Sequence, residues 1–186
     1  ATITGGNVLI KNVIPKHLEP ITSKLEKSGA TIEEFDDSLR VYRTGDLEPL
    51  NIKTMPHPGF PTDMQPLMTV LLTLAKGTSI ITEGIWENRF RYVDELTRMG
   101  ANIQVDGRVA VIEGVQELLP APMRAADLRA GAALVVAALA ADGVSEVDEI
   151  CHIERGYEDI VEKLRGLGAD IKRVEKPAGV LRQAAL

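Results

Sequence analysis

The sequence predicts an α/β fold built from a unit of helices and strands that occurs three times, with two complete copies and one truncated copy. The pattern Leu-x3-Gly-Ala-x-Ile carries this prediction, because it recurs at Leu25–Ile32, Leu96–Ile103 and Leu164–Ile171. The glycines of the three copies are 71 and 68 residues apart, and a nearly fixed period of this size indicates a repeated supersecondary unit. In each repeat, β-rich and amphipathic segments follow one another in the same order around the motif.

The unit begins with a strand and continues through a helix to a hairpin. A glycine opens a segment rich in β-branched residues in each copy, as in short strands, at 6–13, 77–84 and 143–150. An amphipathic stretch follows, for example Tyr92–Met99, with apolar residues at helical spacing. The motif glycine follows, and it suits the end of a helix, where the backbone often adopts a left-handed conformation that strains other residues. Beyond it, Asn102–Val105 and Val109–Ile112 are predicted strands joined at Asp106-Gly107, a typical hairpin turn.

Copies two and three carry a further helix before this strand, at Asp63–Ala75 and Asp127–Ala140. Both segments begin with aspartate, a preferred N-cap residue. Only Ala1–Thr4 and one glycine precede Gly6 in the first copy, so its first helix is absent and an apolar face lacks its cover. We therefore expect the chain to be a piece of a longer protein. Residues 1–176 are expected to form one domain, and the units and the tail are expected at about 1–54, 55–119, 120–176 and 177–186.

Composition narrows the class of protein. The 186 residues are 45% hydrophobic and 26% charged, which is ordinary for a globular domain. A net charge of −6 argues against nucleic acid or an anionic membrane as the main partner. The apolar run at 130–141 is too short to span a bilayer, and the N-terminus lacks the pattern of a secretory signal. The single cysteine, Cys151, excludes an internal disulfide and suits a reducing compartment, so the expected location is the cytoplasm.

Polar residues recur at matching places in the second and third copies. Asp63 follows a proline-rich approach, and two compatible roles are predicted for it: a helix N-cap and a carboxylate base for a substrate hydroxyl. Asp127 and Arg129 are either a solvated capping pair or part of an anion site at a helix N-terminus. Arg89 and Arg155 each lie in the loop before an amphipathic helix, and arginine suits carboxylate or phosphate. These residues indicate an anion-binding face built from loops.

The remaining candidates are weaker. His17 and His57 lack metal-ligand spacing to another histidine or cysteine, so structural or surface roles are favoured and no metal is expected. Cys151 has only the adjacent His152 as a base, so a buried or half-buried structural thiol is favoured over a nucleophile.

At four motifs the chain resembles the UDP-N-acetylglucosamine 1-carboxyvinyltransferases, which are enolpyruvyl transferases. The resemblance extends from Ala1 to about Glu175 and rests on segments 58–65, 82–90, 126–130 and 152–157. It implies an inside-out α/β barrel of repeated units, one of two such domains with the substrates bound in the cleft between them. It also implies transfer of the enolpyruvyl group of phosphoenolpyruvate to the sugar 3-hydroxyl, with no cofactor. The reaction belongs to peptidoglycan synthesis, and hence to cell-wall biogenesis, cell shape and cell division.

The resemblance also implies roles for single residues. Asp63 corresponds to the carboxylate that removes the proton of the sugar 3-hydroxyl, and Ile85 to a backbone contact with the sugar nucleotide. Arg155 corresponds to the arginine that holds the phosphate of phosphoenolpyruvate. Arg89, Asp127 and Arg129 correspond to further polar residues of the family's substrate cleft, and His152 is a weaker match. Cys151 does not correspond to the family's reactive cysteine, which lies in the other domain.

Three functional hypotheses remain open at this point. The first is an enolpyruvyl transferase fragment that is inactive alone, because the missing second domain supplies half of the cleft and helps to exclude water. The second is a stand-alone ligand-binding or scaffold module of the same fold without catalysis. An enolpyruvyl transferase for another acceptor is a third option.

Overall fold

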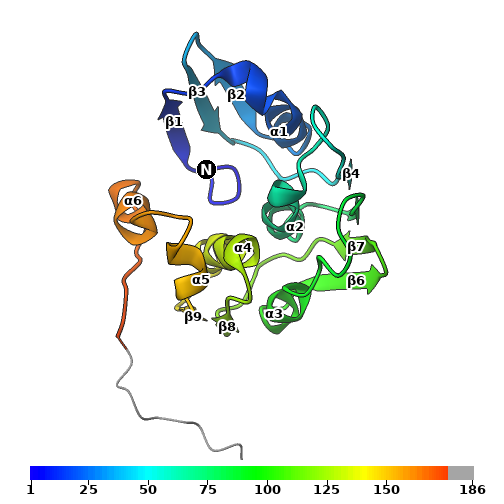
Figure 1. Ribbon diagram of the computed structural model, residues 1–186, viewed down its shortest axis with the longest axis vertical. Coiled ribbons are helices and arrows are strands. Elements are labelled where there is room, and N and C mark those ends of the chain that lie inside the picture. Colours follow the sequence, from blue (N-terminus) through cyan, green and yellow to red (C-terminus); the bar gives the residue numbers. More distant parts are fainter. Residues whose placement is uncertain (176–186) are drawn as a thin grey trace, which may run out of the picture.

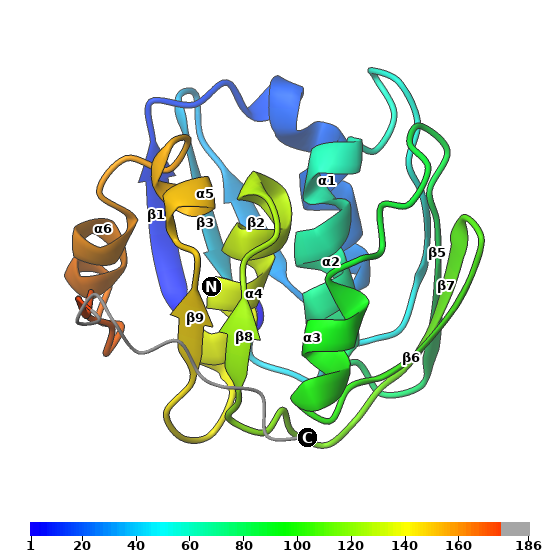
Figure 2. The same ribbon diagram turned by 60° about the horizontal axis from the view of Figure 1, so that its bottom comes forward.

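The computed structural model describes residues 1–175, and the expected tail at 177–186 lies outside them. The chain forms three small sheets, one in each copy of the repeat, around a set of central helices (Figures 1 and 2). The first unit comprises β1 (Asn7–Lys11), α1 (Pro15–Lys27), β2 (Thr31–Glu34) and β3 (Ser38–Tyr42). Its sheet has the order β1-β3-β2 and is antiparallel throughout.

The second unit repeats this arrangement and adds a strand and a helix at its start. Its elements are β4 (Asn51–Lys53), the 3-10 helix η1 (Thr62–Met64), α2 (Gln65–Leu72), β5 (Thr78–Thr82), α3 (Val93–Arg98), β6 (Asn102–Asp106) and β7 (Val109–Glu113). The order β5-β7-β6 matches β1-β3-β2, and the predicted β6–β7 hairpin is confirmed. β4 pairs with β5 in parallel, so this sheet begins a few residues before the boundary expected near residue 54.

The third unit comprises β8 (Pro122–Arg124), α4 (Leu128–Ala140), β9 (Glu146–Asp148), α5 (Cys151–Glu154) and α6 (Ile160–Gly166). β8 pairs with β9 in parallel across α4, as β4 pairs with β5 across α2. The short helix α5 was not expected from the sequence. No strand follows α6 within residues 167–175, so the described part of this unit has no counterpart of the hairpins in the first two units.

The repeated motif ends α1, α3 and α6 by one hydrogen-bond pattern. In each copy the alanine amide donates to the carbonyl of the motif leucine, at 2.9, 3.1 and 3.0 Å. The glycine amide donates to the carbonyl of the residue after that leucine, and φ at the three glycines is +101°, +86° and +96°. These two bonds define the Schellman helix ending, in which a left-handed residue satisfies the last carbonyls. The predicted C-terminal role of the glycine is confirmed.

The helices α2 and α4 occupy the interior, and the sheets lie outside them. α2 and α4 lie side by side in the middle of the molecule, with the sheets around them (Figure 2). Seven of the eight residues of α2 are buried, and the largest hydrophobic cluster joins α2, α3 and α4 to the inner faces of the strands. This arrangement agrees with the expected inside-out α/β fold. Within residues 1–175, no helix combines the length and apolar character needed to cross a membrane.

Candidate active site

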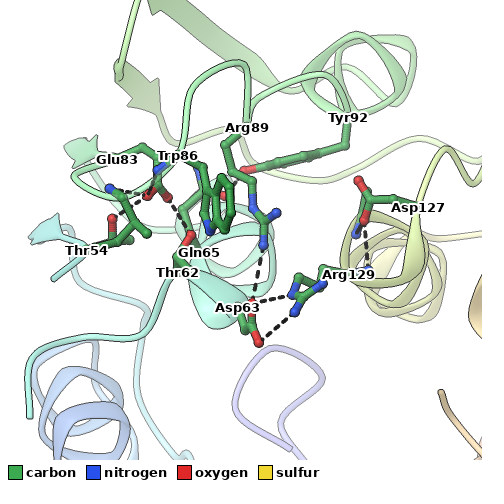
Figure 3. A network of polar contacts seen from close by, with 12 residues as sticks. Thr54, Thr62, Asp63, Gln65, Glu83, Trp86, Arg89, Tyr92, Asp127 and Arg129 are labelled. Atoms are coloured by element: carbon green, nitrogen blue, oxygen red, sulfur yellow. Dashed lines mark hydrogen bonds and ion pairs between the residues drawn. The ribbon is translucent and has the colours of Figure 1, made fainter. Parts of the chain in front are cut away.

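Asp63 lies at the centre of the candidate site, in η1 just before α2 (Figure 3). Its carboxylate contacts Arg129 twice: Nε of Arg129 donates to Oδ1, and Nη2 donates to Oδ2 at 3.0 Å. Nη2 of Arg89 also donates to Oδ1, at 3.3 Å. One carboxylate therefore joins a loop of the second unit to the first turn of α4 in the third. The Asp63 side chain is still 55% exposed, so a ligand can reach it.

The predicted N-cap role of Asp63 is wrong, whereas the same role for Asp127 is confirmed. Asp63 lies inside the 3-10 turn, and α2 begins after Met64 without any side-chain cap. Oδ1 of Asp127 accepts the backbone amides of Arg129 at 2.9 Å and Ala130 at 2.8 Å. The extra turn η1 removes Asp63 from the capping position and turns its carboxylate toward the arginines. Asp127 instead fixes the helix turn that carries Arg129.

The two arginines differ in their surroundings. The hydrogen bond from Arg129 to Asp63 raises the pKa of the Arg129 guanidinium above its usual value, so this side chain is charged at any physiological pH. Arg89 follows Asn88, a residue at φ +53°, and its side chain is only 18% exposed. Its Nε is buried and has no hydrogen-bond partner among the described residues. A buried donor without a partner is uncommon in folded proteins.

A buried polar cluster lies behind the Arg89 loop. The Tyr92 hydroxyl is within hydrogen-bond distance of Oε1 of Gln65, at 3.1 Å, and of Oγ1 of Thr69, at 2.7 Å. Burial raises the pKa of the Tyr92 phenol above its ordinary value, so the group is neutral and acts through hydrogen bonds. These bonds hold the start of α3 against α2. Nε2 of Gln65 is a second buried nitrogen without a partner in the described part of the chain.

Glu83 is the polar residue that sequence reasoning missed. Glu83 directly follows β5 in the sequence, and the residue is only 1% exposed. Oε1 accepts hydrogen bonds from Thr54 Oγ1 at 2.7 Å and from the amides of Ile85 and Trp86 at 2.8 and 3.1 Å. Oε2 accepts one from Thr62 Oγ1 at 3.0 Å (Figure 3). The available signal in the sequence was an acidic residue at the end of a predicted strand.

The structure does not bring every predicted site residue into one cluster. Ile85 is half-buried, and its amide is bonded to Glu83. Arg155 is exposed at the end of α5, and within residues 1–175 no hydrogen bond or ion pair joins it to the Asp63 cluster. Cys151 is exposed, so the buried or half-buried position favoured for it is wrong. His152 lies 3.9 Å from a carboxylate oxygen of Glu149. Among the described residues, no group of three or more His, Cys, Asp and Glu side chains could hold a metal ion.

Comparisons with known proteins show the family of the chain. Residues 1–164 match the family described as EPSP synthase (3-phosphoshikimate 1-carboxyvinyltransferase). The chain is 56% identical over 176 residues to "UDP-N-acetylglucosamine 1-carboxyvinyltransferase 3" of Caldanaerobacter subterraneus, covering 95% of this chain and 42% of that protein. It is 55% identical over 173 residues to the UDP-N-acetylglucosamine 1-carboxyvinyltransferase of Desulfofundulus thermocisternus, covering 93% of this chain and 71% of that protein.

Solved structures show the same fold. The enolpyruvyl transferase NikO from Streptomyces tendae superimposes with a TM-score of 0.84 at 32% identity, over 92% of this chain and 42% of that chain. EPSP synthase from Acinetobacter baumannii gives a TM-score of 0.66 at 20% identity, over 93% and 42%, a likeness of fold alone. The chain thus spans about two fifths of the length of several of the proteins it matches.

Proposed function

The chain belongs to the family of the EPSP synthases and UDP-N-acetylglucosamine 1-carboxyvinyltransferases, and we propose that it forms part of an enzyme of the second kind. The proposed reaction moves the enolpyruvyl group of phosphoenolpyruvate to the 3-hydroxyl of UDP-N-acetylglucosamine. The observation that carries this proposal is the Asp63 carboxylate, solvent-accessible and held between two arginines from different units. Identity of 55–56% to relatives with this name supports it.

In the proposed mechanism, Asp63 accepts the proton of the sugar 3-hydroxyl. The oxygen then bonds to the central carbon of phosphoenolpyruvate while its terminal CH2 carbon takes up a proton from an acid outside the described residues, which gives a tetrahedral ketal. Loss of phosphate from the central carbon and of a proton from the new methyl group re-forms the double bond and completes the transfer. A carboxylate serves as such a base when it lies within hydrogen-bond reach of the hydroxyl. Because Asp63 is already bonded to both arginines, the hydroxyl has to join or replace one of these contacts.

The cations of the site are proposed to bind the anionic substrates. Arg129 and Arg89 lie beside Asp63, and guanidinium groups suit phosphate because they donate in a planar fork. Arg155 is proposed to hold the phosphate of phosphoenolpyruvate, from its own exposed position on α5. At Ile85 the amide is engaged by Glu83, so a backbone contact with the sugar nucleotide falls to its carbonyl oxygen.

We further propose that residues 1–176 form one domain of the enzyme and are inactive alone. The described site opens to solvent on the side of Asp63, and a reacting carboxylate 55% exposed is not shielded from water. The partner in this proposal is the second domain of the same enzyme, which closes the cleft. The proposed setting is peptidoglycan synthesis in the cytoplasm.

Calorimetric titration of the chain with UDP-N-acetylglucosamine tests the proposal. Weak, saturable binding that Asp63→Ala abolishes is the expected result. Asp46→Ala is the matched control, because it removes an exposed aspartate paired with Lys76 on the surface and leaves the site intact. No binding by the unmodified chain even at millimolar ligand would contradict the proposal and favour a scaffold without catalysis.

A further inference from the structure

Glu83 is a buried carboxylate for which the proposed chemistry has no use. Removing an ionised carboxylate from water costs several kcal/mol unless hydrogen bonds replace the lost hydration. Here hydrogen bonds supply this replacement, because three donors converge on Oε1 and one on Oε2 at distances of 2.7 to 3.1 Å. Because the residue is only 1% exposed, the carboxylate of Glu83 does not reach a substrate proton. Its role therefore lies in what it connects.

The four donors come from three segments that are distant in sequence. Thr54 follows β4, Thr62 opens η1, and the amides of Ile85 and Trp86 belong to the loop after β5. Thr54 strengthens the junction by also accepting the Gly84 amide at 2.7 Å. The approach is so close that a Cβ at Gly84 would overlap the carbonyl oxygen of Thr54. This cluster, Glu83 with Thr54 and Thr62, is called the Glu83 clamp below.

The clamp connects two parts of the proposed substrate site. Thr62 immediately precedes Asp63 in η1, so the backbone that carries the catalytic carboxylate is tied to Oε2 of Glu83. Ile85 is tied to Oε1 through its amide. We propose that Glu83 is a positioning residue. It holds η1, which carries Asp63, and the loop after β5, which carries Ile85, at a fixed distance, so that both can contact the same bound sugar nucleotide. The inference rests on the proposed function.

Two near-isosteric variants test the clamp without removing its bulk. Glu83→Gln keeps one acceptor oxygen for Thr54 and the two amides, while its NH2 can donate to the Thr62 hydroxyl, which also accepts. We expect this variant to bind UDP-N-acetylglucosamine within about threefold of the unmodified chain, because the geometry survives the loss of charge. Thr62→Val removes only the link to the Asp63 turn and should weaken binding about tenfold, since small misplacements at a reacting group are costly. Thr78→Val, at the exposed start of β5, is the matched control.

Two readouts separate positioning from a general loss of structure. Amide hydrogen exchange at Ile85 and Trp86, measured without ligand, should be slow in the unmodified chain and in Glu83→Gln, and fast in Glu83→Ala. Trp86 is the only tryptophan and is 58% exposed, so its fluorescence reports the loop directly. Urea unfolding checks that each variant is folded.

The outcomes distinguish this inference from the proposed function. A Thr62→Val chain that binds as tightly as the unmodified one overturns the positioning role alone. A Glu83→Gln chain that loses binding as completely as Asp63→Ala overturns it too, because the charge itself would then act on the ligand. Failure of the unmodified chain to bind contradicts the proposed function, while amide exchange that is fast at both loop amides refutes the clamp whether or not ligand binds.

Discussion

Replacing Asp63 and Arg129 by alanine, singly and together, separates a catalytic ion pair from a structural one. Both side chains are open to solvent, at 55% and 39% exposure. Exposed ion pairs contribute about 0.2–1 kcal/mol to the free energy of unfolding. We therefore expect a coupling energy of that size between the two residues in a double-mutant cycle measured by urea unfolding. An ion pair that supported the fold would show a larger coupling energy.

Binding of the nucleotide sugar should respond far more strongly than stability. A hydrogen bond to a charged group is worth about 1.5–3 kcal/mol, which corresponds to a loss of roughly 10- to 150-fold in affinity. Because the unmodified chain is expected to bind weakly, a loss of this size should take binding by Asp63→Ala below detection in calorimetric titration. The reasoning is refuted if the coupling energy for unfolding exceeds about 2 kcal/mol, or if Asp63→Ala binds as well as the unmodified chain.

Three further outcomes follow from the structure. Gly168→Ala should lower the free energy of unfolding by about 1–2 kcal/mol, the cost of a left-handed residue with a Cβ. Gly29→Ala should lower the free energy of unfolding further in the same urea experiment, because its Cβ would also lie 2.6 Å from a backbone carbonyl oxygen. An equal loss of stability in the two variants would contradict this reasoning. Tyr92→Phe should lower the free energy of unfolding by about 1–3 kcal/mol, because the buried Oε1 of Gln65 loses its partner and Thr69 Oγ1 keeps only its bond to the Gln65 carbonyl. Unchanged stability would mean that the Gln65 side chain finds another partner. Arg124→Ala should raise the pKa of Glu149, which the Arg124 hydrogen bond holds below its usual value, and an unmoved NMR titration would disprove that pairing. The stabilisation from this pair is present above the ordinary glutamate pKa and disappears as the pH falls through the lowered value.

Local features of the chain were predictable because short-range rules govern them. The motif glycine ends a helix wherever its amide and that of the following alanine can bond back to the last turn, which requires only neighbouring residues. The Asp106-Gly107 turn and the Asp127 cap are equally local, and both were predicted correctly. The repeat also indicated that loops of the second and third units share one face. Asp63 and Arg129 do meet there, although they are far apart in sequence.

Long-range partners decided the rest. Asp63 and Asp127 occupy matching positions in the repeat, yet only one caps a helix, because an extra 3-10 turn and the nearby Arg129 give Asp63 a different partner. Glu83 is an ordinary acidic residue in the sequence and becomes a buried junction only when three segments fold around it. The sequence alone thus determined the repeated unit, the helix endings and the residue types of the site, since these depend on neighbours along the chain. Tertiary structure decided which carboxylate faces the arginines and which one holds the loops, because burial and hydrogen-bond partners depend on neighbours in space.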